Sequence, residues 1–334
     1  MSEEYLKFQV GNSAAYVRVC CLDRLREADA AIFDCDGVLI DTRDSYRKSI
    51  IETVKYLVRE LTDAEPPTDK VLMETTHLLK RSGGFNNDWD VAYAILLFLF
   101  SKMPEEFKSE FIALTRSERL LNMGTLRERF DYLRASLKSR PAEFIVGSDE
   151  LETELKRFTQ NVDDSGIDSV ESVFINSDGK EIFSAAKRFL NYPGDARESL
   201  LTTIFDEMFY GPKLFEETHK RKRQFYHGAG FVEIEREKTL VTSGVLEDLA
   251  QSLKKENFGI VSGRDRLSAR FSLGKILDKF RREAVIFLMD CNYPSEQVEE
   301  ERAKLRKPNP YPLIKASKGL APFKYSLYIG DSAE

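Results

Sequence analysis

Apolar residues recur at three- and four-residue intervals through most of the chain between about Thr42 and Lys238. Segments such as 45–61, 69–81 and 118–137 each repeat this spacing, which is typical of amphipathic helices. Clusters of proline and glycine, for example SGG at 82–84, separate the segments. The central part of the chain is therefore predicted to be helical.

A different pattern begins at Thr239, where the short apolar runs FGIVS, AVIFLM and SLYI alternate with helical segments. Strands that alternate with helices predict a parallel sheet, and the earlier run AAIF at 30–33 has the same character. We expect one α/β domain built from residues 1–44 and 239–334, with an all-helical domain at 45–238 inserted after its first strand. Residues 5–22 alternate around GNS and predict a hairpin.

Net charge and composition exclude several kinds of partner and location. The net charge is −6, so there is no overall basic field, and nucleic acid is not an expected partner. A basic cluster at 219–223 is interpreted as a solvated helix face. The four cysteines lack metal-ligand spacing, the N-terminus lacks an apolar signal core, and the apolar run at 91–100 is too short to span a bilayer. We expect a soluble, cytoplasmic protein that does not bind membranes.

Polar side chains follow the predicted strands at the points where they end. Asp34 and Asp36 follow the first strand, Ser262 ends the next, and Asp331 follows the last. Lys307 lies in the segment KPNP, in which Asn309 is predicted to cap a helix that starts at Pro310. Asp and Gly also favour ordinary turns, but the order of all these residues favours a site at one edge of the sheet.

The residues at this edge suit phosphoryl chemistry. An ionised Asp34 is a competent oxygen nucleophile, provided that its charge does not repel an anionic substrate. Like charges at about 4 Å and an effective dielectric near 20 cost on the order of 4 kcal/mol, so a cation is implied. The carboxylates of Asp34 and Asp331 and the backbone carbonyl of Asp36 are oxygen ligands that suit Mg²⁺.

The remaining groups can position and neutralise a phosphoryl group. Lys307 adds a positive charge, and Ser262 with the Gly263 amide can donate hydrogen bonds to phosphoryl oxygens. Asp36 can protonate the leaving alcohol and then deprotonate the water that hydrolyses an aspartyl phosphate.

The motifs DCDGVLID, VSGRD, KPNP and IGDSAE together resemble the four motifs of the haloacid dehalogenase-like (HAD) superfamily of hydrolases, over residues 30–44 and about 240–334. The resemblance implies a Rossmann-like parallel α/β core, with a helical cap domain between the first and second motifs. By this resemblance Asp34 is the nucleophile and Asp36 the acid/base. Ser262 is the second-motif hydroxyl, Lys307 the third-motif lysine and Asp331 a metal ligand.

The resemblance also bears on the type of reaction. Dehalogenases of the superfamily lack an acid at the position of Asp36, and phosphonate hydrolases carry a small residue there, so an aspartate implies a phosphatase or a phosphomutase. The fourth motif of the family usually supplies another acid a few residues after the first. Either Glu334 takes that metal role here or the acid lies beyond the end of the chain, and we favour the second interpretation.

Several further residues are assigned to substrate binding. Arg264 follows Gly263 in the second motif, and Arg43 and Arg47 follow the first motif, although helix arginines are often only solvated. The segment GGFNNDWD at 83–90 looks like one in a branch of the superfamily that is assigned to phosphatases. Asn86 and Asp88 within it could reach a substrate, but helix capping explains such residues equally well.

We therefore expect a Mg²⁺-dependent phosphatase that hydrolyses a small phosphorylated metabolite through an aspartyl-phosphate intermediate. A phosphomutase of the same superfamily and a catalytically silent binding or regulatory protein are the alternatives. A homodimer is the partner arrangement that we keep open. The sequence does not name the substrate.

Overall fold

The computed structural model describes residues 5–11, 13–85, 87–139, 142–175, 179–234, 237–288 and 309–331. The described residues form two compact units, which are treated separately below. The core unit comprises the described residues up to Thr42 and from Glu237 onward, and the helical unit comprises those that begin at Arg43. Each boundary lies two residues from the division made from the sequence at 44 and 239.

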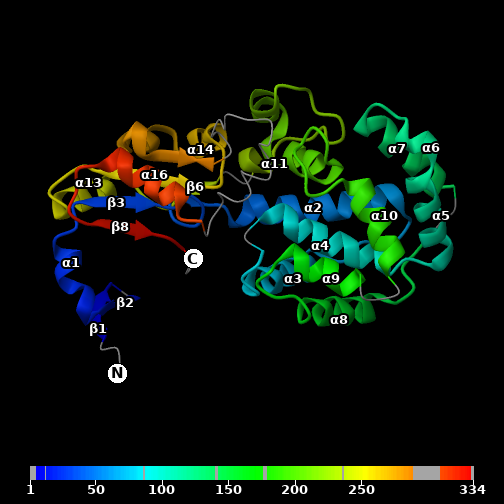
Figure 1. The fold of residues 1–334 in the computed structure, drawn as a ribbon, viewed down its shortest axis with the longest axis horizontal. Helices are drawn as coiled ribbons and strands as arrows, with labels where there is room; N and C mark the ends of the chain where they lie inside the picture. The colour runs from blue at the N-terminus through cyan, green and yellow to red at the C-terminus, as the bar shows by residue number, and fades with distance from the viewer. Residues whose placement is uncertain are drawn as a thin grey trace. The chain divides into compact units, whose positions relative to one another are not determined.

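A four-stranded parallel sheet lies at the centre of the core unit (Figure 1). Its strand order is β7-β6-β3-β8, so the first strand in sequence lies inside the sheet. Phe33 of β3 pairs with Ile260 on one side and with Ile329 on the other. The α/β fold predicted from the alternation of strands and helices is confirmed. The strands are β3 (Ala30–Phe33), β6 (Phe258–Ser262), β7 (Val285–Phe287) and β8 (Ser326–Ile329).

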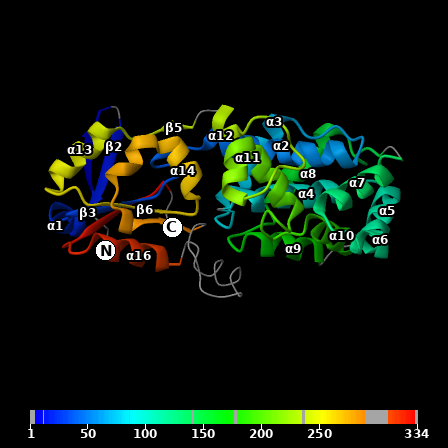
Figure 2. The same ribbon diagram turned by 90° about the horizontal axis from the view of Figure 1, so that it is seen from above.

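Helices cover both faces of this sheet, as Figure 2 shows. Because successive strand residues point to opposite faces, Ala31 and Phe33 pack with α13 (Ser243–Ser252) and α14 (Arg266–Leu273). Ala30 and Ile32 pack against α16 (Tyr311–Leu320) on the other face. Burial on both faces explains why β3 and β6 are continuous apolar runs.

Two small antiparallel pairs complete the core unit. The predicted N-terminal hairpin is present as β1 (Tyr5–Val10) and β2 (Ser13–Arg18). The strands β4 (Ile40–Asp41) and β5 (Lys238–Thr239) pair where the chain leaves the core unit and re-enters it. The short helices of this unit are η1 (Val19–Cys21), α1 (Leu22–Arg26), η2 (Gly274–Lys279) and η3 (Arg282–Ala284).

The described residues of the helical unit form only helices, turns and loops. Its apolar segment 91–100 is buried throughout within α4, and in the described part of the chain no helix has the length and apolar character needed to cross a membrane. The helices are α2 (Arg43–Leu61), α3 (Asp69–Arg81), α4 (Asp88–Ser101), α5 (Glu105–Arg116), α6 (Glu118–Leu121), α7 (Leu126–Leu137), α8 (Ser148–Thr159), α9 (Ile167–Ile175), α10 (Lys180–Leu190), α11 (Leu200–His219) and α12 (Phe231–Ile234).

Three local predictions were wrong. The segment 118–137 is not one helix, because Thr125 caps α7 in a capping box with Glu128 and ends the continuity. The basic cluster at 219–223 is not a helix face, because α11 ends at His219 and Lys220 adopts a left-handed φ of 55°. The helix after the third motif begins at Tyr311, one residue later than predicted, while Asn309 Oδ1 accepts the Tyr311 backbone N–H at 2.8 Å.

Candidate active site

Asp34 follows directly from the buried strand β3 and is itself only 8% exposed. Its backbone N–H donates to the Ile329 carbonyl at 2.9 Å and so continues the pairing of β3 with β8. Its Oδ1 accepts the Cys35 backbone N–H at 2.6 Å. One bond thus fixes the backbone of Asp34 and the other its carboxylate, at the carboxyl end of a central strand, the edge at which parallel sheets bind ligands.

A tight turn follows, and it brings Asp331 against the first motif. Gly37 adopts a φ of +75°, its N–H donates to the Ile40 carbonyl at 2.8 Å, and the Leu39 N–H donates to the Cys35 carbonyl at 2.8 Å. An ideal Cβ on Gly37 would lie 2.7 Å from Asp331 Cγ, closer than real atoms approach. Glycine is therefore required both by the backbone and by the neighbouring carboxylate, and Asp331 lies beside the turn that carries Asp34 and Asp36.

Asp36 is held by an ionic chain that runs through the core unit. Arg264 Nη1 donates to Asp36 Oδ1 at 2.9 Å, and Arg264 Nη2 donates to Glu237 Oε2 at 2.5 Å. The side chains of Arg264 and Glu237 are 0% and 1% exposed, whereas that of Asp36 is 31% exposed. Burial raises the pKa of Asp36 to about 6 against the opposing effect of Arg264, and Glu237 and Asp34 add to the rise.

Ser262 and Gly263 lie at the end of the neighbouring strand β6. Ser262 is buried, and its Oγ accepts the Arg264 backbone N–H at 3.1 Å. An ideal Cβ on Gly263 would meet no atom within 4 Å, so there is open space beside this residue. The structure therefore brings Asp34, Asp36, Ser262, Gly263, Arg264 and Asp331 to one edge of the sheet.

The environment of Arg264 differs from that of an exposed substrate contact. Its Nε donates to Ser268 Oγ at 2.9 Å, and Nη2 also reaches Ser272 Oγ at 3.4 Å. All three nitrogens of the guanidinium thus have partners within the core unit. Glu237 was not singled out from the sequence, because it lies 27 residues before Arg264 and belongs to no recognisable motif.

The substrate-binding candidates of the helical unit lie in varied surroundings. Arg43 is exposed at the first position of α2, and Arg47 is half-buried one turn later. Asp88 forms an ion pair with Lys80 at 2.7 Å, and its side chain is largely buried. Asn87 accepts the Trp89 backbone N–H at 3.1 Å and caps α4, so capping accounts for part of the segment 83–90. Asn86 lies outside the described residues.

Two residues assigned to the site, Lys307 and Glu334, also lie outside the described residues. Within the described ranges, no group of three or more His, Cys, Asp or Glu side chains is arranged to hold a metal ion. A site with two carboxylates and a backbone carbonyl is compatible with that finding, because Mg²⁺ usually keeps several waters and is completed by substrate phosphate.

These features define the class of the protein: an α/β protein with carboxylates at the carboxyl edge of a parallel sheet. The family model for haloacid dehalogenase-like hydrolases matches residues 28–334, and the chain belongs to this family of hydrolases. The family recognised from the motifs is thereby confirmed. Members of the superfamily generally use Mg²⁺.

Two solved structures are similar to the chain. A target of the Northeast Structural Genomics Consortium is 18% identical with a TM-score of 0.58, and the match covers 86% of this chain and 77% of that one. Phosphatase Tt82 from Thermococcus thioreducens is 16% identical with a TM-score of 0.44, over 90% of this chain and 91% of that one. The sequence has no significant match among curated proteins. The first of these likenesses supports the fold assignment.

Proposed function

We propose that the protein is a phosphatase that hydrolyses a small phosphorylated metabolite through an aspartyl-phosphate intermediate. The observation that carries the proposal is the pair Asp34 and Asp36 at the end of β3. Asp34 is held by backbone contacts, and Asp36 is partly exposed with a pKa raised to about 6. A carboxylate nucleophile beside a carboxyl group whose acid form persists up to about pH 6 is the pairing that nucleophilic attack with acid catalysis requires.

The reaction has two steps. A carboxylate oxygen of Asp34 attacks phosphorus while the bond to the ester oxygen breaks, and the proton of Asp36 passes to the leaving alcohol. A water molecule then attacks the aspartyl phosphate and gives its proton to Asp36, which releases inorganic phosphate and restores the Asp34 carboxylate. Ser262, the Gly263 amide and Lys307 are the proposed donors to the phosphoryl oxygens.

The donor set fits a hard divalent cation such as Mg²⁺. The carboxylates of Asp34 and Asp331 and the backbone carbonyl of Asp36 would hold it, since Asp331 packs against Gly37 in the turn that carries the other two. Glu334 is a further candidate ligand. When bound, the ion would offset the repulsion between these carboxylates and an anionic phosphate, about 4 kcal/mol for each close pair at an effective dielectric near 20.

In the helical unit, the arginines near the start of α2 are the favoured substrate contacts. Arg43 is exposed and Arg47 half-buried, and we propose both as contacts for an anionic group of the substrate. Asp88 is a weaker candidate because it is paired with Lys80. Asn86 is retained as a proposed contact, and a homodimer as the proposed partner arrangement.

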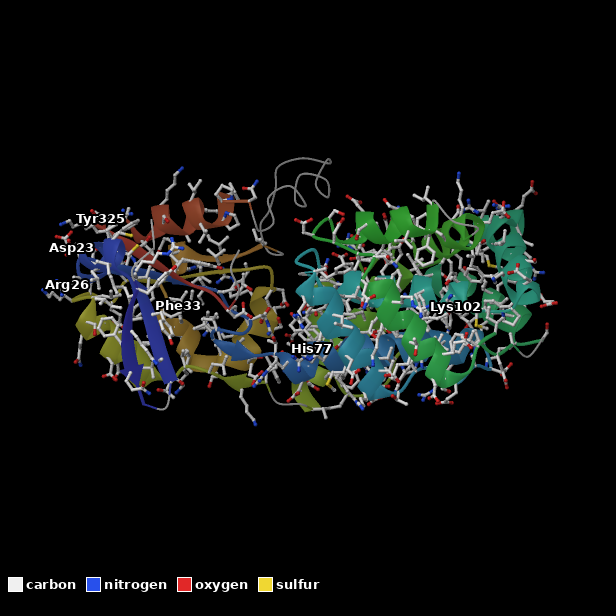
Figure 3. All side chains as sticks on the ribbon, turned by 90° about the horizontal axis from the view of Figure 1, so that it is seen from below. Asp23, Arg26, Phe33, His77, Lys102 and Tyr325 are labelled. Atoms are coloured by element: carbon white, nitrogen blue, oxygen red, sulfur yellow. The ribbon has the colours of Figure 1, made fainter. Side chains whose placement is uncertain are left out.

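The test is phosphate release from a panel of phosphorylated metabolites, with and without Mg²⁺. Asp34→Asn is compared with Asp23→Asn, a matched control whose side chain is 96% exposed on the surface of the core unit (Figure 3). We expect turnover that requires Mg²⁺, is abolished in Asp34→Asn and is unchanged in Asp23→Asn. Turnover that persists in Asp34→Asn would refute the proposed nucleophile.

A further inference from the structure

The guanidinium of Arg264 is committed to the protein interior. It is fully buried, and it donates to Asp36, Glu237 and Ser268, with a longer contact to Ser272. A substrate contact would need some of these bonds to break, which would leave buried polar groups without hydrogen-bond partners and is therefore unfavourable. The geometry therefore favours a role for Arg264 that acts on Asp36 and not on the substrate.

Glu237 fixes the far side of the same guanidinium. Its Oε2 accepts Arg264 Nη2 at 2.5 Å and Ser272 Oγ at 2.5 Å, and its side chain is 1% exposed. A guanidinium is planar, so two partners at its ends set the orientation of the whole group. The direction from which Nη1 approaches Asp36 Oδ1 is thus determined by Glu237.

The position of Glu237 in the chain adds a second constraint. It is the residue at which the chain re-enters the core unit, and β5 follows immediately. In β5 Thr239 pairs with Ile40, and the next residue, Leu240, donates to the Leu39 carbonyl at 2.8 Å. The re-entering segment therefore supports the loop of Asp36 through the backbone and through the ionic chain.

We propose that Arg264 and Glu237 are positioning residues for Asp36, which hold its carboxylate in the orientation needed to protonate the leaving group. This proposal rests on the proposed function. Asp36 is the only one of the three whose side chain is substantially exposed, as expected if it alone meets the reacting atoms.

The test compares kcat/KM for two esters, p-nitrophenyl phosphate and an alkyl phosphate that the wild type hydrolyses. An alkoxide leaves poorly and depends on a proton from Asp36, whereas p-nitrophenolate leaves readily. In Glu237→Gln we expect kcat/KM for the alkyl ester to fall about tenfold or more, part of the 10²–10⁴-fold effect of general acid catalysis, while the aryl ester changes less than about threefold. Asp36→Asn sets the upper limit of this selective loss.

Controls separate positioning from damage to the fold. Glu247→Gln breaks a more exposed ion pair with Lys279 in the same unit and should affect neither ester. Ser272→Ala removes a neutral donor to Glu237 and the longer contact from Arg264, and should give a smaller loss with the same preference for the alkyl ester. Equal losses on both esters, or no loss, in variants with wild-type circular dichroism would overturn the positioning role. If the wild type released phosphate from no member of the metabolite panel, the proposed function would be refuted, and with it the positioning role that rests on it.

Discussion

Gly37 offers a substitution whose effect on stability and on the site can be separated. Its φ is +75°, and an ideal Cβ would lie 2.7 Å from Asp331 Cγ. Gly274 in the same unit also has a positive φ, +53°, but a Cβ there would meet nothing within 4 Å. Gly37→Ala therefore combines backbone strain with displacement of Asp331, whereas Gly274→Ala imposes the backbone strain alone.

The magnitudes follow from these two terms. A non-glycine residue at a sparsely populated positive φ costs about 1–3 kcal/mol. Moving the Asp331 side chain away from a preferred rotamer costs about 0.5–1.5 kcal/mol more. We expect Gly37→Ala to lower the free energy of unfolding of the core unit by about 1.5–4.5 kcal/mol, and Gly274→Ala to lower it by about 1–3 kcal/mol.

Scanning calorimetry is the appropriate stability assay, because the only tryptophan, Trp89, lies in the helical unit and does not report on the core unit. Phosphate release as a function of Mg²⁺ concentration is measured on the same samples. Gly37→Ala should lose at least about tenfold in activity and need more Mg²⁺, since a displaced ligand oxygen weakens a site with few protein ligands. Gly274→Ala should keep the wild-type Mg²⁺ dependence. The same Mg²⁺ dependence in both variants would show that Asp331 is not a ligand.

Two further predictions concern buried and titrating carboxylates. Glu207 in the helical unit is buried and accepts the backbone N–H groups of Gln224, Phe225 and Tyr226 at 2.6–2.8 Å, so Glu207→Ala should lower the unfolding free energy by about 3 kcal/mol or more. Urea unfolding followed by Trp89 fluorescence checks this, with the exposed Glu217→Gln as control, and a loss below about 1 kcal/mol would contradict it. Because the pKa of Asp36 is raised to about 6, its acid form persists to that pH, and kcat/KM should fall as the pH rises through about 6. Asp36→Asn should lack that limb, and an identical limb in the variant would exclude Asp36 as its source.

The strands of the core unit could be predicted from the sequence because the patterns that mark them are local. A strand buried on both faces is a continuous apolar run, and the residue where it ends identifies the binding edge without knowledge of its neighbours. Asp34 and Ser262 could be assigned to one edge for this reason, and Asp331 because it follows the short apolar run of β8, although β8 is not buried. The break at Thr125 was missed because apolar spacing continues across it, while the capping box that interrupts the helix depends on two polar residues.

The ionic chain through Glu237 could not be predicted in the same way. Glu237 lies in a charged segment, EIEREK, in which no residue is distinguished by spacing, and its side chain contacts Arg264 and Ser272, which lie far from it in the sequence. Arg264 looked like an anion contact because it follows a Ser-Gly pair at a strand end. Its guanidinium instead binds Asp36, which lies 228 residues earlier in the chain, and Glu237, which lies 27 residues earlier.

These partners change the charge balance of the site. If Arg264 were directed at the substrate, it would neutralise part of a phosphate dianion, but its charge is instead shared by two carboxylates. Asp34 and Asp331 add two further carboxylates at the same edge of the sheet, and protonation of Asp36 removes only one negative charge. At an effective dielectric near 20, these carboxylates would repel a phosphate dianion by several kcal/mol. Because Arg264 is bound to two carboxylates of the protein, we expect turnover to require a divalent cation together with Lys307. The dependence of activity on Mg²⁺ is therefore the most informative property to measure.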